Sequence, residues 1–379
     1  MSRYDGLIIP RSYNEYINKT DAATLQQALQ LSGVLSAIVA AGDNKAVKSS
    51  AVYEALTNYI NKTDAATLSQ ALRLPGVLQD KPEKESKSPI ESGGVWSAIH
   101  AISHNIPRLV PKDITAYITD GTLWKRLNGT DGFALFEDIY VGDYFEMSRA
   151  ISAYEKTGTY QTTGSKFVTI AGIDTMWGNG DSDVISKHHL VMVPGQGFGG
   201  TQHFGRARMN AADDTTGGYK ASEMNVETLG AVASSGSTAA TASINQQLYA
   251  EFGAHLQTTK ELLSNALNAS GINRLGGGID LGCSSNWEWI SVQAVLMSEV
   301  EVYGATVWSS SGYDTGSANR QLPLFAFSKQ AQNNHTAWYW LKDVASADYF
   351  CLASLAGSSI YSLASLAGRY VRPRFILAA

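Results

Sequence analysis

The sequence predicts an α+β fold with a helical N-terminal region and a C-terminal domain made mainly of short strands. From about residue 115 onward, short runs rich in β-branched and aromatic residues alternate with glycine-containing loops, and few segments show a helical period. Before that point, alanine-rich segments with leucines four residues apart indicate short helices. The chain has 379 residues, of which 44% are hydrophobic, so it is long enough for two or three domains with their own cores.

The N-terminal region contains an internal repeat. The stretch YINKTDAATLQQALQLSGVL at 16–35 recurs at 59–78, an offset of 43 residues, with three differences in twenty positions. Each copy has a Thr-Asp pair that suits a helix N-terminus, followed by leucines at i and i+4. A weaker third copy begins near residue 92. Repeats at a fixed period argue for an array of similar units.

These repeat helices need packing partners, because their apolar stripe is too narrow to form a core alone. Two arrangements would supply partners: a small bundle within one chain, or a parallel trimeric stalk in which identical helices meet about an axis. We favour the stalk, and therefore expect a homotrimer in which residues 1–79 serve oligomerisation and attachment. Residues 80–114, which include a charged, proline-flanked stretch, are expected to form a linker and a partial third repeat.

Residues 115–379 are expected to form one domain of short strands joined by long loops, which are themselves typical of binding proteins. A helical piece is expected near 221–232, and one long helix from Ile244 to Leu267, where apolar residues recur mostly at four-residue steps. Strand-like segments are expected at 115–119, 121–127, 136–145, 158–163, 166–173, 188–194, 287–308, 321–327, 337–345, 348–354 and 371–377.

Composition and charge exclude several classes of partner. The formal net charge is −5, only 17% of residues are charged and no basic block occurs, so nucleic acid is not expected to bind. The longest apolar run, 33–41, is far shorter than a membrane span, and the N-terminus lacks the pattern of a secretory signal. The two cysteines, Cys283 and Cys351, are expected to be free thiols in a protein that folds in a reducing compartment.

No convincing catalytic or metal-binding constellation is visible in the sequence, and no cofactor is expected. His188 and His189 precede an apolar strand, where adjacent side chains face opposite ways, so we expect one structural inward histidine and one exposed histidine rather than a metal pair. Glu299 and Glu301 alternate along an expected strand and share a face. A pair for acid and base catalysis is one interpretation, and we favour an exposed strand face.

The segment from Asp343 to Tyr370 has an unusual composition. Its 28 residues include no Glu, Lys, Gln, Met or Trp, although these five types supply 61 of the 379 residues in the chain. The string LASLAG occurs twice within it, at 352–357 and 363–368. The five missing amino acids are those that an NNY codon, one ending in a pyrimidine, cannot encode. The composition therefore suggests that this segment has been sampled by mutagenesis.

The C-terminal motifs resemble one known family. In order they read HHLVMVP (188–194), LMSEVEVYGATVW (296–308), NRQLPLF (319–325), AWYWLKDVAS (337–346) and VRPRF (371–375). In combination they resemble the C-type-lectin-like domain of phage tail and receptor-binding proteins, including the variable proteins of diversity-generating retroelements. Such proteins carry a pattern close to WYWLR-x-VAS, then variable positions, then GVRPxF. This chain has Lys342 in place of the Arg, and Tyr370 where a Gly often precedes VRP.

The resemblance covers roughly residues 115–379, and the N-terminal pieces look like the repeated helical segments of phage tail fibres. It implies a virion protein of the phage tail, made in the host cytoplasm, that contacts other phage tail proteins through its N-terminus. It also implies that the C-terminal domain binds a receptor on a bacterial cell surface and catalyses no reaction. In this family a reverse transcriptase copies a template with errors at adenines, so that AAY codons become NNY.

The resemblance divides the C-terminal residues into scaffold and display positions within a variable-type region, 337–370. The scaffold positions are Trp338, Trp340, Leu341, Arg372, Pro373 and Phe375. The display positions, which are expected to bind the receptor, are Ala337, Asp348, Ser354, Leu355, Ala356, Ser358, Ser359, Ile360, Tyr361, Ser362, Leu363, Leu366, Arg369 and Tyr370.

The display positions are apolar for a surface, which is typical of a protein-binding site, and we therefore favour a protein receptor over a glycan. Three copies in a trimer would gain avidity without any new contact. Two other hypotheses stay open. One is an enzyme of the formylglycine-generating type, which shares the lectin-like fold and needs reactive cysteines placed together. The other is a structural virion component that decorates the particle without binding a receptor.

Overall fold

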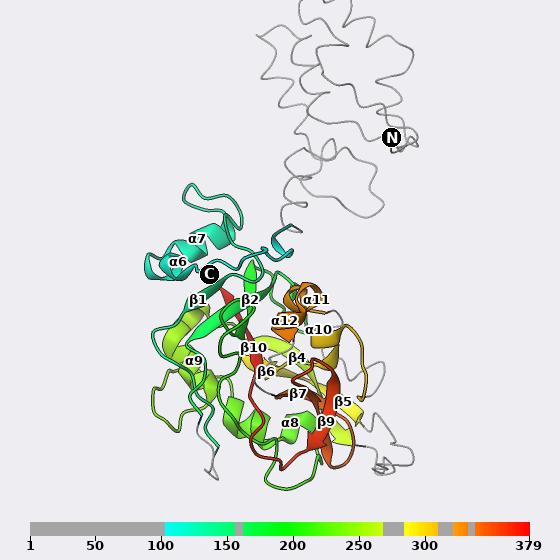
Figure 1. Cartoon of the computed structure of the whole chain (residues 1–379). Coiled ribbons are helices and arrows are strands. Elements are labelled where there is room, and N and C mark those ends of the chain that lie inside the picture. The colour runs from blue at the N-terminus through cyan, green and yellow to red at the C-terminus, as the bar shows by residue number, and fades with distance from the viewer. Residues whose placement is uncertain (1–102, 156–161, 268–283, 310–320, 333–337) are drawn as a thin grey trace, which may run out of the picture. The chain divides into compact units, whose positions relative to one another are not determined.

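The computed structural model describes residues 103–155, 162–267, 284–309, 321–332 and 338–379 (Figure 1). All of them belong to one compact unit, Ala101–Ala379. The expected helical repeats at 1–79, and the stalk that we expect them to form, lie outside these residues. The same holds for Cys283 and for the display position Ala337.

The described part of the chain has an α+β fold with several antiparallel sheets, as the sequence predicts. The largest sheet has five strands in the order β1-β2-β3-β10-β6. Its strands are β1 (Tyr144–Glu146), β2 (Phe167–Ile173), β3 (His189–Pro194), β6 (Ala294–Leu296) and β10 (Pro373–Ala378). Every residue of β3, β6 and β10 is buried. The final strand of the chain therefore lies inside the domain, between β3 and β6.

Two smaller antiparallel sheets complete the strand content. One is the hairpin of β4 (Thr259–Leu267) and β5 (Ser284–Val292). The other has the order β7-β8-β9 and consists of β7 (Tyr339–Val344), β8 (Tyr349–Ala353) and β9 (Ser359–Leu363). All three strands of the second sheet lie within the variable-type region, 337–370, that the sequence singles out.

The helices are short. They are α6 (Thr115–Thr119), α7 (Thr122–Asn128), α8 (Gly218–Ala221), η2 (Met224–Leu229), α9 (Ile244–Phe252), η3 (Gly253–His255), α10 (Glu299–Tyr303), α11 (Pro323–Phe327) and α12 (Lys329–Gln332). Two of them begin with a capping box, in which a serine side chain and the residue three positions later satisfy each other's backbone N–H groups: Ser243 with Gln246 in α9, and Ser298 with Glu301 in α10. None of the described helices is long and apolar enough to cross a membrane.

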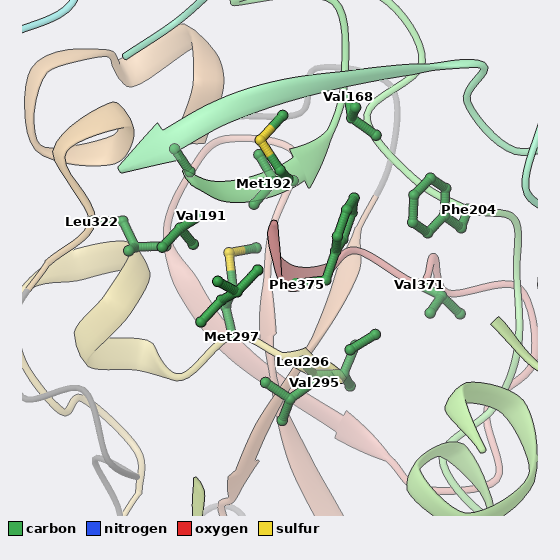
Figure 2. Packing of buried hydrophobic residues seen from close by; sticks show 14 of the residues in the cluster. Val168, Val191, Met192, Phe204, Val295, Leu296, Met297, Leu322, Val371 and Phe375 are labelled. Atoms are coloured by element: carbon green, nitrogen blue, oxygen red, sulfur yellow. The ribbon is translucent and has the colours of Figure 1, made fainter. Parts of the chain in front are cut away.

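The main hydrophobic core surrounds β10. Figure 2 shows Phe375 of β10 among apolar side chains from β2, β3 and β6. The Phe375 ring lies 6.3 Å from that of Phe204 and 5.8 Å from that of Phe252, measured between centroids. Aromatic side chains bury a large apolar area, so this cluster is a main source of the stability of the domain.

The expected long helix from Ile244 to Leu267 is wrong in its second half. Helix α9 ends at Phe252, and Gly253 follows it with φ 54° and ψ −129°, a conformation that glycine adopts at little cost. After the short η3 helix the chain becomes strand β4, in which Thr259, Glu261 and Leu263 are buried and Lys260 and Leu262 are less so. The four-residue spacing of apolar residues thus spans two elements of different type.

Several expected strands are helices. The segment 115–119 is α6, most of 121–127 belongs to α7, 299–303 is α10 and most of 321–327 belongs to α11. Pro323 occupies the first turn of α11, where its missing N–H costs nothing. Of the expected strand 136–145, only the last residues enter β1, because Phe136 and Asp138 adopt positive φ angles in a series of turns. Most of the expected strand 158–163 lies outside the described residues.

The C-terminal domain begins earlier than residue 115. Residues 103–114, which we assigned to the linker, pack against the rest of the domain. The side chains of His104 and Ile114 are fully buried. The Lys112 backbone N–H donates to the Asp143 carboxylate (3.0 Å). The boundary of the compact unit accordingly falls before Ala101.

Candidate functional site

The hairpin of β8 and β9 carries most of the expected display positions. Its register is continuous, with Tyr349 opposite Leu363 at one end and Ala353 opposite Ser359 at the other. The turn is closed by a hydrogen bond from the Ser354 N–H to the Ser358 carbonyl (2.9 Å). We call residues 349–363 the display hairpin.

The expected display positions differ in exposure. Leu355, Ala356, Ser358 and Leu366 are exposed, Leu355 by 41% and Leu366 by 39%. The half-buried positions are Asp348, Ser359, Ile360, Tyr361, Leu363, Arg369 and Tyr370. The structure thus brings the exposed and half-buried positions together along one hairpin and the segment that follows it.

Two expected display positions, Ser354 and Ser362, are buried, so the expectation that they are displayed is wrong. The Ser354 hydroxyl is held inside the turn by the Ser358 hydroxyl (2.8 Å between the oxygens). Ser362 lies opposite Phe350, which is fully buried, and directly opposite residues in a sheet share a face. Composition alone did not distinguish the two faces of β9.

Three aromatic side chains meet on the opposite face of the display hairpin. The Tyr361 ring makes edge contacts with the rings of Tyr349 (5.3 Å between centroids) and Trp308 (4.9 Å). The Trp308 indole N–H donates to the Ser359 carbonyl (2.9 Å). We call Trp308, Tyr349 and Tyr361 the aromatic cluster. The sequence analysis missed Trp308 and Tyr349. Alternation along β8 could have indicated Tyr349, whereas Trp308 reaches β9 only through the tertiary fold.

The Glu299 carboxylate fixes the loop that carries Trp308. One of its oxygens accepts the backbone N–H groups of Val307 (2.9 Å), Trp308 (3.0 Å) and Ser309 (3.1 Å), together with the Ser309 hydroxyl (3.0 Å). The other oxygen accepts the hydroxyl of the display position Ser359. A carboxylate that accepts several donors holds them strongly, because each bond is charge-assisted. Glu299 therefore connects α10, the Trp308 loop and β9.

Our expectation that Glu299 and Glu301 form an exposed strand face is wrong. Both lie in α10 and both are fully buried. Helical geometry places them on different sides of α10, and each has its own set of partners, so they do not form an acid and base pair. The Glu301 carboxylate ion-pairs with Arg374 and lies 3.8 Å from the Lys342 ammonium.

A buried ion network joins strands β4, β7 and β10 with helix α10. Glu261 of β4 pairs with Arg374 (2.6 Å) and with Lys342 (3.1 Å), and Glu301 completes the network. Burial on its own lowers the pKa of Arg374, but Glu261 and Glu301 outweigh burial and raise the pKa. Lys342, which stands where the related pattern has Arg, thus has two carboxylate partners.

Most of the expected scaffold residues lie in the interior. Trp340, Leu341, Arg372, Pro373 and Phe375 are buried, and Trp338 is half-buried. The Arg372 guanidinium donates to the Ala331 carbonyl (2.7 Å) and stacks over the rings of Phe325 (5.2 Å) and Tyr339 (4.9 Å). Burial lowers the pKa of Arg372.

Stacking also holds the end of the variable-type region. The Arg206 guanidinium lies over the Tyr370 ring (4.6 Å) and donates to the Tyr370 hydroxyl. The His203 ring also contacts the Tyr370 ring, at 4.0 Å between centroids. The Arg369 guanidinium lies 4.2 Å over the Trp338 ring. Arg369 and Tyr370 are therefore held by neighbouring side chains, unlike Leu355 and Leu366 at the exposed turns.

The other candidate residues have structural environments. Cys351, which we placed in the variable-type region, is fully buried in the middle strand of its sheet. As expected, His189 is buried and His188 is more exposed. His189 accepts the Met176 backbone N–H (3.1 Å), and burial lowers its pKa. Within the described residues, no group of three His, Cys, Asp or Glu side chains could hold a metal ion.

Comparison of the chain with models of protein families, with curated proteins and with solved structures found no match. The likeness to C-type-lectin-like proteins thus depends on the short motifs quoted above. What the described geometry offers chemically is a surface for binding: an exposed apolar turn, a half-buried strand at the edge of a sheet, and aromatic rings beside it.

Proposed function

We propose that this chain is a receptor-binding protein of the phage tail-fibre type. In this proposal the C-terminal domain has a C-type-lectin-like fold and presents the display hairpin and the segment after it to a receptor on a bacterial cell surface. The N-terminal repeats form a trimeric stalk that attaches to other tail proteins, and the chain resides in the virion.

The observation that carries the proposal is the contrast between the buried middle strand β8 and the exposed turns on either side of β9. Phe350, Cys351 and Leu352 in β8 are fully buried and fix the backbone. Leu355 and Leu366, at the turns on either side of β9, are exposed although they are large and apolar. A rigid support with exposed apolar side chains is what a binding surface needs, because little freedom is lost when a partner docks.

A protein receptor is favoured over a glycan. Residues 354–367 contain no charged side chain. Apolar and aromatic contact area supplies most of the affinity at protein interfaces, with Tyr and Trp over-represented among the residues that matter most. The aromatic cluster and the neighbouring leucines fit this chemistry. In a trimer, three such surfaces would bind one cell through avidity.

The proposal includes diversification by a retroelement. Exposed positions such as Leu355 and Leu366 tolerate substitution because little of the side chain packs against the core. Residues 343–370 also lack all five amino acids that NNY codons cannot encode. The DNA next to the gene tests this part: we expect a near-copy of the sequence that encodes the segment, differing at adenines, beside a reverse transcriptase gene. Absence of both would refute diversification and leave receptor binding as a separate question.

Binding of the labelled full-length chain to a panel of bacterial strains, measured by flow cytometry, tests receptor recognition. We expect at least one strain to bind, and we expect the double variant Leu355→Asp with Leu366→Asp to lose about tenfold or more in affinity, since charges would enter an apolar contact. A second double variant, Ile360→Asp with Tyr361→Asp, extends the test to β9. Circular dichroism checks that both variants fold.

Phe327→Asp is the matched control, because Phe327 in α11 is 63% exposed and lies outside the variable-type region. It should bind as the unmodified chain does. If both double variants fold and bind a responsive strain without loss, the display hairpin is not the receptor site. If no strain in a broad panel binds the chain, receptor recognition itself is wrong.

A further inference from the structure

Strand β9 is an edge strand, and its backbone groups alternate between its partner and the outside. Residues 354 and 358, and residues 348 and 364, are joined by backbone hydrogen bonds at the two ends of the hairpin. In an antiparallel pair such bonded positions recur at every second residue. Ile360 and Ser362 therefore point their N–H and C=O groups toward β8, whereas Ser359, Tyr361 and Leu363 point theirs away from it.

Two of these outward groups are occupied within the domain. The Ser359 carbonyl accepts the Trp308 indole N–H (2.9 Å). The Leu363 carbonyl accepts the Leu366 N–H in the following turn (3.1 Å). Within the described residues, no hydrogen-bond partner reaches the N–H and C=O of Tyr361 or the N–H of Leu363. Three backbone groups in a row are thus available for pairing.

The opposite edge of the same sheet is closed. The Trp340 N–H of β7 donates to the Tyr370 carbonyl (3.0 Å), and the Tyr370 N–H donates to the Trp338 carbonyl (2.9 Å). Further along β7, the Lys342 N–H donates to the Met297 carbonyl (2.9 Å). Other backbone segments therefore cover the β7 edge at these positions, whereas no described segment covers β9 in this way at Tyr361.

The β6 edge of the large sheet is protected in a way that β9 is not. Proteins commonly protect edge strands with charged residues, prolines, bulges, shortness or covering side chains. On β6, side chains cover the edge: Asn245 accepts the Ala294 N–H (2.9 Å), and the Tyr219 hydroxyl accepts the Leu296 N–H (3.2 Å). Strand β9, with the sequence SIYSL, has five residues, no charge, no proline and a continuous register.

We propose that an extended segment of the receptor protein pairs with the outer edge of β9 and adds a fourth strand to the β7-β8-β9 sheet. This inference rests on the proposed function and specifies how the receptor is bound. Strand addition gains affinity from backbone hydrogen bonds, and side-chain contacts on alternate positions give specificity. The Tyr361 N–H and C=O and the Leu363 N–H are the groups that form these bonds.

The surroundings of β9 define the chemistry of the added segment. On one face its side chains meet Tyr361 and Trp308, and on the other they meet Ile360. Neither face presents a charge within residues 354–367. The segment is therefore expected to be uncharged and rich in β-branched or aromatic residues, which pack well across strands. Trp308 at Ser359 and the turn after Leu363 limit its length to a few residues.

Paired substitutions at Tyr361 separate the backbone from the side chain. Tyr361→Ala removes the ring and keeps the N–H, whereas Tyr361→Pro removes both. Proline is tolerated at an edge position whose N–H points outward. In binding to a responsive strain of the panel, we expect Tyr361→Pro to be about tenfold weaker than Tyr361→Ala, the loss of one buried hydrogen bond. Equal binding of the two variants would overturn the proposal.

Amide hydrogen exchange of the free chain tests the same geometry without a receptor. The Tyr361 and Leu363 amides should exchange faster than those of Ile360 and Ser362, which bond to β8. Ser362→Pro is the fold control, because it removes an N–H that bonds to β8 and should lower the melting temperature. Tyr361→Pro should have a melting temperature close to that of Tyr361→Ala. A slowly exchanging Tyr361 amide in the free chain would show that the edge is already paired and would overturn the proposal.

Two further outcomes identify other occupants. If the free chain self-associates and Tyr361→Pro abolishes the association, the edge pairs with a second copy, and a receptor segment is refuted. If no strain is bound, the proposed function fails, and the edge is then probed with an uncharged synthetic peptide of the sequence 349–354, with serine for Cys351 and blocked termini. Binding of this peptide by the chain but not by Tyr361→Pro would support a pairing edge, and no binding would refute it.

Discussion

Replacement of Glu299 by glutamine tests whether the Trp308 loop depends on a single buried carboxylate. One oxygen of Glu299 accepts three backbone N–H groups and a hydroxyl, and the other accepts the Ser359 hydroxyl. Glutamine keeps one acceptor oxygen but loses the charge, and it places an NH₂ group where the second oxygen was. Hydrogen bonds to a charged group contribute about 1.5–3 kcal/mol each and neutral ones about 0.5–1.5 kcal/mol.

Because the four donors share one oxygen, their contributions do not add fully, and we expect Glu299→Gln to lower the free energy of unfolding by about 2–4 kcal/mol. For a domain of this size each kcal/mol corresponds to about 2–4 °C. Thermal melting followed by tryptophan fluorescence should therefore show a decrease of about 5–10 °C. The variant should also bind a responsive strain more weakly, because Trp308 would no longer be fixed beside Tyr361.

Glu288→Gln is the matched control. Glu288 pairs with Lys220 (2.5 Å) at an exposed site, and exposed ion pairs contribute little to stability. Its loss should leave the melting temperature nearly unchanged. If Glu299→Gln has the same melting temperature as Glu288→Gln and the unmodified chain, the Trp308 loop is held by other contacts. Our account of Glu299 is then wrong.

Two further predictions concern buried charge. Lys342→Met should lower the free energy of unfolding by about 3–5 kcal/mol in urea denaturation, because Glu261 and Glu301 lose a cation in the interior, whereas Lys342→Arg should be tolerated better. Equal stability of Lys342→Met and the unmodified chain would refute this. Burial, aided by the positive charges of Arg206 and Arg372, lowers the pKa of His203 from 6.5 to about 4, so its stabilisation is complete above pH 6.5 and is lost as the pH falls toward 4. The free energy of unfolding should fall by about 3 kcal/mol over this pH range. In His203→Gln it should depend less on pH over the same range, and an unchanged pH dependence would refute this prediction.

The sequence predicted the fold class and the strands with continuous apolar or aromatic character. Segments 166–173, 188–194, 337–345, 348–354 and 371–377 all contain strands. Their side chains are bulky and β-branched or aromatic, so their strand propensity favours the same structure as their burial in the fold. The wrong predictions fall where the residue pattern favours one type of element and the fold contains another. The segment 299–303 alternates like a strand, but Ser298 and Glu301 form a capping box that begins a helix.

The sequence selected a segment of the chain but not the exposure of each residue within it. Composition identified the segment from Asp343 to Tyr370, and the structure shows that exposed residues within it cluster at the turns beside β9. Composition carries no information about which face of a strand is buried, so Ser354 and Ser362 were assigned to the display positions in error. Trp308 could not be found from the sequence, because the fold alone brings it against Ser359.

The two glutamates of α10 connect the buried interior with the display hairpin. Glu301 points into the buried ion network with Lys342 of β7 and Arg374 of β10, and so joins two of the quoted motifs. Glu299, on the other side of α10, holds the Trp308 loop and the Ser359 hydroxyl. Substitutions at the exposed turns touch neither set of bonds, whereas a change at Ser359 removes one that helps hold β9. Variation at Ser359 should therefore cost more in stability than variation at the exposed Leu355.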